Sequence, residues 1–183
     1  LARLATELER LAHGNPSGID PAVVAAGRPI VFRRGRPPEL LALPRPFPLV
    51  VADSGARAGS TGEVVAAVRA LHDADPGRIG PVIEEIGALA LRAAAALEAN
   101  DLPAVGRLMD ANHSLLVELT VSSPALDRLV EAARAAGALG AKLSGAGRGG
   151  IVVALGRPGR TAGIAEALSA AGARQVSDLE GLS

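Results

Sequence analysis

Residues 145–150, Gly-Ala-Gly-Arg-Gly-Gly, limit the fold of this chain more than any other segment. They lie between two strand-like segments, residues 141–144 and the β-branched run at 151–155. Gly145, Gly147 and Gly150 satisfy the spacing of a dinucleotide-binding loop, but that loop needs a helix directly after its glycines. Because a strand is predicted there instead, the segment is expected to connect two strands.

This glycine loop either serves a ligand or merely closes a turn. Without Cβ atoms, its N–H groups can approach an anion or a substrate closely. A tight connection would need the same glycines only for their positive φ angles. Lys142, just before the loop, either faces the same cleft or is a surface or strand-end lysine. The residues alone leave these alternatives open.

The order of the remaining segments predicts an α+β fold. Short apolar runs separated by Gly, Pro and Arg indicate strands between residues 28 and 53. Apolar periodicity and breakers indicate further elements: helices at 1–12, 78–99, 101–119, 124–136 and 161–171, and a strand at 174–176. The three central helices are expected to pack as antiparallel neighbours.

Capping residues predict two more helices. Ser17 can cap a helix that Gly27 ends. Ser60 and Glu63 stand in capping-box register ahead of apolar residues at helical spacing, and the residues from Asp53 to that cap are expected to form a loop. A weak domain boundary is placed near residue 57.

Composition excludes several classes of function. Aromatic residues make up 1% of the chain, so the core must be aliphatic and base stacking on aromatic platforms is excluded. Nineteen basic residues balance nineteen acidic ones, which leaves no net field to attract nucleic acid or an anionic membrane. The absence of cysteine fits a cytoplasmic protein. No apolar run approaches the roughly 20 residues that span a bilayer.

Asp20 and Glu9 are the candidate carboxylates for chemistry. Glu9 ends one predicted helix and Asp20 lies in the first turn of the next, across the tight turn at 13–16. Both can therefore point into one cleft, where one holds a hard cation and the other takes a proton. The competing interpretation makes Asp20 a helix-dipole acid and Glu9 a surface acid.

The histidines give weaker signals. His13 is either a base or metal ligand, or a turn residue that bonds to the local backbone. His72 and His113 stand apart on predicted helices without a partner at ligand spacing, and both are expected to be structural.

Residues 7–20, Glu-Leu-Glu-Arg-Leu-Ala-His-Gly-Asn-Pro-Ser-Gly-Ile-Asp, resemble the mevalonate kinase branch of the GHMP small-molecule kinases. Segments 53–61 and 140–150 follow in the order and approximate spacing expected of that family. The resemblance implies the end of an S5-like α/β domain over residues 1–57, which carries the residue 13–20 segment. It implies a ferredoxin-like GHMP kinase C-terminal domain with extra helices over residues 58–183.

The implied activity is transfer of the ATP γ-phosphate to the primary hydroxyl of mevalonate, a cytoplasmic step of isoprenoid precursor synthesis in the mevalonate pathway. By this resemblance Asp20 is the catalytic carboxylate and Glu9 holds Mg²⁺. Ser60 and Thr61 match a loop whose hydroxyls can reach the substrate, and capping competes with that role. The implied contacts are cofactor-binding Gly145, Ala146, Gly147 and Gly149, and substrate-binding His13, Ser17, Gly18, Thr61 and Ser144.

Two differences from the family bear on this expectation. Arg148 stands where the family usually has glycine, and it either adds a phosphate contact or points into solvent. The family's main nucleotide loop lies upstream of the helix that begins this chain, so we expect a C-terminal fragment that binds ATP poorly and is inactive without that part. A second copy of the chain or the missing N-terminal segment is expected to cover the unpaired sheet edge.

Two alternatives to mevalonate phosphorylation remain. One is a GHMP kinase that acts on another small hydroxylated acid or sugar. The other is a truncated, non-catalytic binding or assembly module.

Overall fold

The computed structural model describes residues 18–57 and 59–179, whose contacts divide the chain into two compact units, Leu1–Pro44 and Arg45–Ser183. The described part of the first unit contains helix α2 (Ile19–Ala26) and the antiparallel pair β1 (Ile30–Val31) and β2 (Glu39–Leu40). Gly27 ends α2 with a φ of 59°, as predicted. The N-cap is Gly18, without a side-chain hydrogen bond, and not the expected Ser17, which lies outside the described residues.

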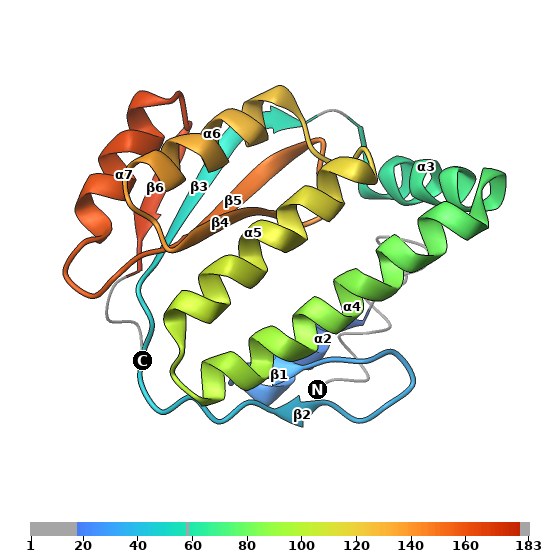
Figure 1. Cartoon of the computed structure of the whole chain (residues 1–183), viewed down its shortest axis with the longest axis horizontal. Coiled ribbons are helices and arrows are strands. Elements are labelled where there is room, and N and C mark those ends of the chain that lie inside the picture. The colour runs from blue at the N-terminus through green and yellow to red at the C-terminus, as the bar shows by residue number, and fades with distance from the viewer. Residues whose placement is uncertain (1–17, 58, 180–183) are drawn as a thin grey trace. The chain divides into compact units, whose positions relative to one another are not determined.

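The second unit is built on a four-stranded antiparallel sheet in the order β4-β5-β3-β6 (Figure 1). Its strands are β3 (Leu49–Arg57), β4 (Gly140–Ser144), β5 (Gly149–Leu155) and β6 (Gln175–Asp178). Because β3 pairs with both β5 and β6, residues 49–57 belong to this sheet. By its contacts the chain divides after Pro44, so β3 lies in the second compact unit. The domain boundary near residue 57 stays a prediction.

The end of β3 differs from the sequence prediction. Residues 53–57 were expected to form a loop, but they extend the strand through a register shift between Asp53 and Arg57. The Asp53 carboxylate accepts a hydrogen bond from the Gly55 N–H at 2.9 Å, and Gly55 has a φ of 70°. This local bond and the left-handed glycine produce a bulge, which the loop-like composition concealed.

Five helices accompany the sheet, and each agrees with a predicted helix within a few residues. They are α3 (Thr61–Ala74), α4 (Pro76–Glu98), α5 (Leu102–Glu118), α6 (Pro124–Ala135) and α7 (Thr161–Ala170). Asp75, Asp101 and Ser123 cap α4, α5 and α6, each ahead of a proline in the first turn. With α2 the described residues contain six helices and two antiparallel sheets, so the predicted α+β class is confirmed.

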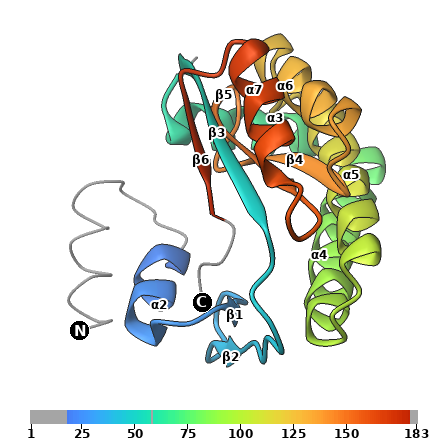
Figure 2. The ribbon, with the colours of Figure 1, turned by 90° about the vertical axis from the view of Figure 1, so that its left-hand side faces the viewer.

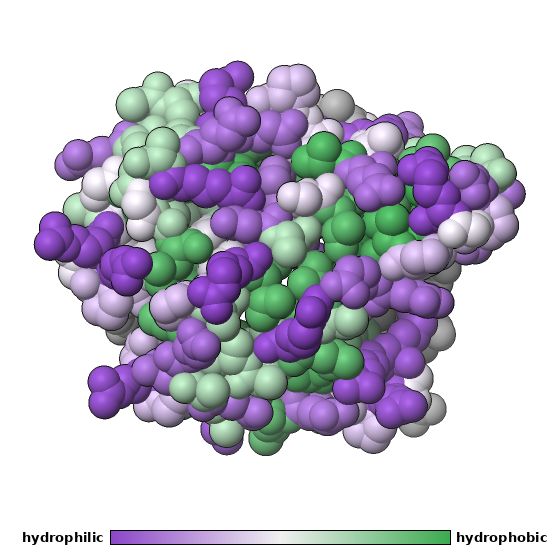
Figure 3. Space-filling model, in the orientation of Figure 1, coloured by the Kyte–Doolittle hydropathy of each residue, from purple (hydrophilic) through white to green (hydrophobic). Residues whose placement is uncertain are grey.

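Helices α6 and α7 lie against one face of the sheet, and α4 packs along α5 beside it (Figures 1 and 2). Side chains alternate along the strands, so that Ala141, Leu143 and Val152 face the helices and are buried. Their partners in the core are aliphatic, as the composition requires: Leu126, Leu129, Val130, Ile164 and Leu168. Apolar residues remain visible between α4 and α5 (Figure 3).

Helix α5 covers the outer edge of β4. Asp110 accepts hydrogen bonds from the Ala141 N–H at 2.9 Å and from Arg134 at 2.7 Å, while Arg134 also donates to the Ala141 carbonyl. Nδ1 of His113 accepts from the Leu143 N–H at 3.4 Å. Side chains of the helical layer thus satisfy the backbone groups of an edge strand, which would otherwise be open to pairing with another chain.

Candidate functional site

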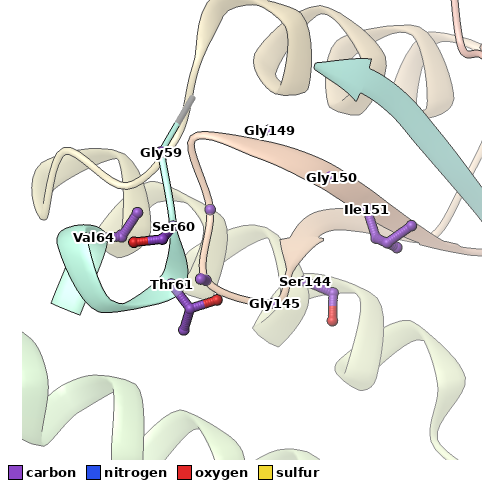
Figure 4. Close-up of a pocket in the computed structure, with 11 residues that line it drawn as sticks. Gly59, Ser60, Thr61, Val64, Ser144, Gly145, Gly149, Gly150 and Ile151 are labelled. Carbon is purple, nitrogen blue, oxygen red and sulfur yellow. The ribbon is translucent and has the colours of Figure 1, made fainter. Parts of the chain in front are cut away.

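An open pocket of about 320 Å³ lies between the N-terminus of α3 and the hairpin that joins β4 to β5 (Figure 4). It brings together residues from two segments that are eighty positions apart in the sequence. Six of the residues expected to contact nucleotide or substrate line it: Thr61, Ser144, Gly145, Ala146, Gly147 and Gly149. The glycine loop and the start of α3 therefore form one concave surface.

Two positions of the hairpin at residues 145–148 have a backbone conformation that favours glycine. Gly145 and Gly147 have φ values of 88° and 91°. A Cβ atom on Gly147 would lie 2.1 Å from the Val121 carbonyl oxygen, whereas one on Gly145 would meet open space. Within the described chain, the N–H groups of residues 145–147 have no hydrogen-bond acceptor. Successive free amides in a loop of this kind suit an anion.

The hairpin is fixed from two sides. The Arg148 N–H donates to the Val121 carbonyl at 2.6 Å, which ties the tip to the turn between α5 and α6. The Gly150 N–H donates to the Ser54 hydroxyl on β3 at 3.0 Å. The free amides therefore belong to a loop whose base is held in place.

Arg148 does not line the pocket. Its backbone is left-handed, with a φ of 55°, and its Nε lies 3.5 Å from the Thr120 carbonyl oxygen as a weak donor. The side chain thus rests on the α5–α6 turn. The left-handed backbone also explains physically why glycine suits this position.

Helix α3 faces the pocket with its N-terminus. The Ser60 hydroxyl accepts from the Glu63 N–H at 3.3 Å, and the Glu63 carboxylate accepts from the Ser60 N–H at 2.6 Å. The predicted capping box is confirmed, so the Ser60 hydroxyl is committed to the helix. Thr61 follows at the first helical position, and its side chain lies near Gly145 (Figure 4). The partial positive charge of the helix end adds to the attraction for an anion.

A buried polar network supports the strand that enters the hairpin. His113 is 5% exposed, and its Nε2 lies 3.4 Å from the Asp127 carboxylate, which also accepts from the Ser122 hydroxyl. Burial lowers the pKa of His113, with the Arg134 charge acting in the same direction. Because Nδ1 accepts from a backbone N–H, the neutral ring carries its proton on Nε2. This arrangement agrees with the structural role expected for His113.

The remaining predicted site residues belong to the first unit or lie outside the described residues. Gly18 and Asp20 belong to the first unit, where Asp20 is exposed in the first turn of α2. Glu9, His13 and Ser17 lie outside the described residues. Among the residues that the structure describes, no group of three or more His, Cys, Asp or Glu side chains could hold a metal ion. The Glu9 and Asp20 pair remains a prediction.

Sequence reasoning missed several residues at the pocket. Gly59, Val64 and Ile151 line it, although none was assigned to the site. Ile151 could have been found from its place directly after the glycine run. It lies at the pocket because it pairs with Ser144 across the hairpin. Ser54 could not be found without knowing that β3 pairs with β5.

No helix in the described part of the chain has both the length and the apolar character that a membrane span requires.

Residues 93–174 match the family model of the GHMP kinase C-terminal domain. The mevalonate kinase of Pyrococcus horikoshii is 41% identical over 180 residues, which covers 94% of this chain and 52% of the relative. The mevalonate kinase of Thermococcus onnurineus is also 41% identical, with the same coverage. The crystal structure of L. major mevalonate kinase in complex with R-mevalonate superposes with a TM-score of 0.86 at 35% identity, covering 93% of this chain and 54% of that chain. The chain thus spans about half the length of the curated relatives that it matches.

Proposed function

Because this chain contains a GHMP kinase C-terminal domain, we propose that it forms part of an ATP-dependent kinase whose acceptor is the primary hydroxyl of mevalonate. One observation carries the proposal. Six of the residues expected to contact nucleotide or substrate line one pocket, which free backbone amides and a helix N-terminus form.

The pocket suits the phosphate groups of a nucleotide. The amides of residues 145–147 donate to phosphate oxygens, and the positive end of α3 stabilises the same charge. The hydroxyls of Thr61 and Ser144 orient the bound groups. Because the hairpin is held in place before a ligand arrives, its donors need little rearrangement during the reaction. ATP, with Mg²⁺, supplies the phosphoryl group and the cation that neutralises its charge.

The acceptor is activated by Asp20 in this proposal. Its carboxylate takes the proton of the acceptor hydroxyl as the oxygen bonds to the γ-phosphorus and the bond to the β-phosphate oxygen breaks. The products are the phosphorylated acceptor and ADP. Glu9 holds the Mg²⁺ ion, as the resemblance implies.

The test measures ADP release with mevalonate and Mg·ATP. It uses the 183-residue chain, alone and fused behind the part of the Pyrococcus horikoshii relative that the chain does not cover. We expect turnover from the fusion and a loss of about 100-fold or more with Asp20→Asn, because general-base catalysis contributes about that factor. Asp73→Asn is the matched control, since that carboxylate lies on α3 with its side chain 70% exposed.

Undiminished activity of Asp20→Asn would exclude the assigned base. A panel of other hydroxylated acids and sugars in the same assay tests the acceptor, since faster turnover of one of them would replace mevalonate. If no acceptor supports turnover, calorimetry with Mg·ATP and with mevalonate identifies a binding module that does not catalyse transfer.

A further inference from the structure

Lys142 is the single lysine in the chain, among nineteen basic residues. It lies on β4 between Ala141 and Leu143, which face the buried core. Because side chains alternate along a strand, Lys142 shares the opposite face with Ser144, and two residues of a strand span about 7 Å. Ser144 lines the pocket, so Lys142 lies two residues along β4 from a pocket residue.

Among the residues that the structure describes, the ammonium group of Lys142 has an incomplete set of partners. It donates one hydrogen bond, to the Leu143 carbonyl at 2.7 Å. Within residues 18–57 and 59–179, no carboxylate forms an ion pair with it at 4.0 Å or less. Arg134, which contacts the same edge strand from α6, is paired with Asp110 at 2.7 Å. A lysine ammonium has three N–H donors, so two remain for a ligand.

The surroundings of this charge make an anionic ligand favourable. Burial lowers the pKa of Lys142 from its ordinary 10.5, with no opposing contribution from a carboxylate. A partly desolvated cation without a counter-ion destabilises the folded state, and an anion that binds beside it removes this penalty. Lys142 itself is not among the residues that line the pocket, and the free amides of residues 145–147 begin three positions after it in the chain.

We propose that Lys142 anchors an oxyanion, either the carboxylate of the acceptor or a phosphate of the nucleotide, at the base of the glycine hairpin. The identity of these two ligands rests on the proposed function. The anion site itself rests on the strand geometry and on an ammonium group that pairs with no carboxylate among the described residues.

A single lysine makes a direct test possible. Protein made with ¹³C-labelled lysine has one lysine side-chain signal, whose pH titration reports the pKa of Lys142. We expect that pKa to lie below 10.5 without ligand and to rise when the anion binds. One arm adds R-mevalonate and the other adds tripolyphosphate, so the arm that raises the pKa identifies the carboxylate or the phosphate. A pKa that neither ligand moves would overturn the proposal.

Substitution gives a second readout. Lys142→Met should melt at a higher temperature than the parent protein without ligand, because it removes an unpaired charge, and it should lose the rise in Tm that the anion produces. In the kinase fusion, this variant should raise KM for the anchored ligand about 10-fold and leave kcat within about 3-fold, since the lysine binds and does not react. Arg107→Met, which removes an exposed cation from α5, is the control.

The outcomes separate this inference from the proposed function. A pKa shift without ADP release from the fusion would exclude the kinase and leave the anion site. Turnover without a pKa shift, and with an unchanged KM in Lys142→Met, would exclude the anchor alone.

Discussion

The two compact units differ in how their candidate functional residues are supported. The described part of the first unit places Asp20 on an eight-residue helix, beside two strands of two residues each. Only Pro21 and Leu41 are buried among its described residues. In the second unit the glycine hairpin continues two strands of a sheet with a buried aliphatic core. The phosphate-binding candidate is thus preorganised by packing, while local burial contributes little to holding the acid.

This difference has a physical consequence for the phosphoryl transfer that we propose. Backbone amides stabilise developing charge best when they are fixed before the reaction, and the hairpin meets this condition through Val121 and Ser54. A single carboxylate on a short helix needs only to reach the acceptor proton. Substitutions beneath the hairpin should therefore cost much more stability than substitutions on α2.

The largest effect is expected where α5 meets β4. A Cβ atom on Gly106 would lie 2.2 Å from the Leu139 carbonyl oxygen, so Gly106→Ala must push the helix away from the strand. We expect a loss of about 3 kcal/mol in the free energy of unfolding, measured by urea denaturation.

Gly87→Ala on α4 is the matched control, because its Cβ would meet open space. It should gain about 0.5–1 kcal/mol from helix propensity. Equal stability of the two variants would show that the close approach of α5 to β4 does not exist in solution.

The next effect concerns the polar clamp on the edge strand. Asp110→Ala leaves the Ala141 N–H and the Arg134 guanidinium without their acceptor, and each lost partner is partly buried. We expect a loss of about 2–3 kcal/mol in the same urea experiment. Glu85→Ala removes a surface carboxylate that pairs with Arg92 and should cost less than about 1 kcal/mol. If the two substitutions cost the same, the clamp contributes no more than a surface ion pair.

Much of this architecture could be predicted from the sequence. The helices from α4 to α7 follow from apolar spacing, and their ends follow from Pro, Gly, Asp and Ser. The hairpin followed from one argument, that a β-branched run after the glycines cannot be the helix of a dinucleotide-binding loop. Local chemistry determines these elements, so local patterns are sufficient to find them.

The contacts between distant segments could not be predicted in this way. The bulge that carries β3 to Arg57 depends on a hydrogen bond from the Gly55 N–H to Asp53, and β3 pairs with residues of β5 that are about a hundred positions away. Asp110 and His113 were not expected to cover an edge strand, because nothing in the sequence shows which strand lies at the edge. The convergence of Thr61 and Gly145 on one pocket likewise requires the fold.

A smaller effect should appear as a dependence on pH. The pKa of His113 is lowered by burial, so the unfolded chain takes up a proton at a higher pH than the folded protein does. The contribution of neutral His113 to the free energy of unfolding is therefore fully present above its pKa in the unfolded chain, about 6.5. It decreases as the pH falls toward the pKa of the folded protein. Urea denaturation between pH 7.5 and pH 5 should show this decline.

His113→Gln should flatten the decline, because the amide oxygen can still accept from the Leu143 N–H but does not titrate. His72→Gln, at a side chain that is 44% exposed, is the matched control. A parent protein whose stability does not change over this range would contradict the buried, neutral state of His113.

The smallest effect tests the first unit directly. Val24 on α2 is 79% exposed, so Val24→Ala removes almost no buried surface and replaces a β-branched residue with a better helix former. We expect a change within about 0.5 kcal/mol, whereas Val152→Ala, at a position that is 0% exposed on β5, should cost about 2 kcal/mol. A loss above 1 kcal/mol at Val24 would mean that this surface of α2 is covered in solution. In that case the helix that carries Asp20 is held by packing, as the hairpin is, and the contrast between the two units does not hold.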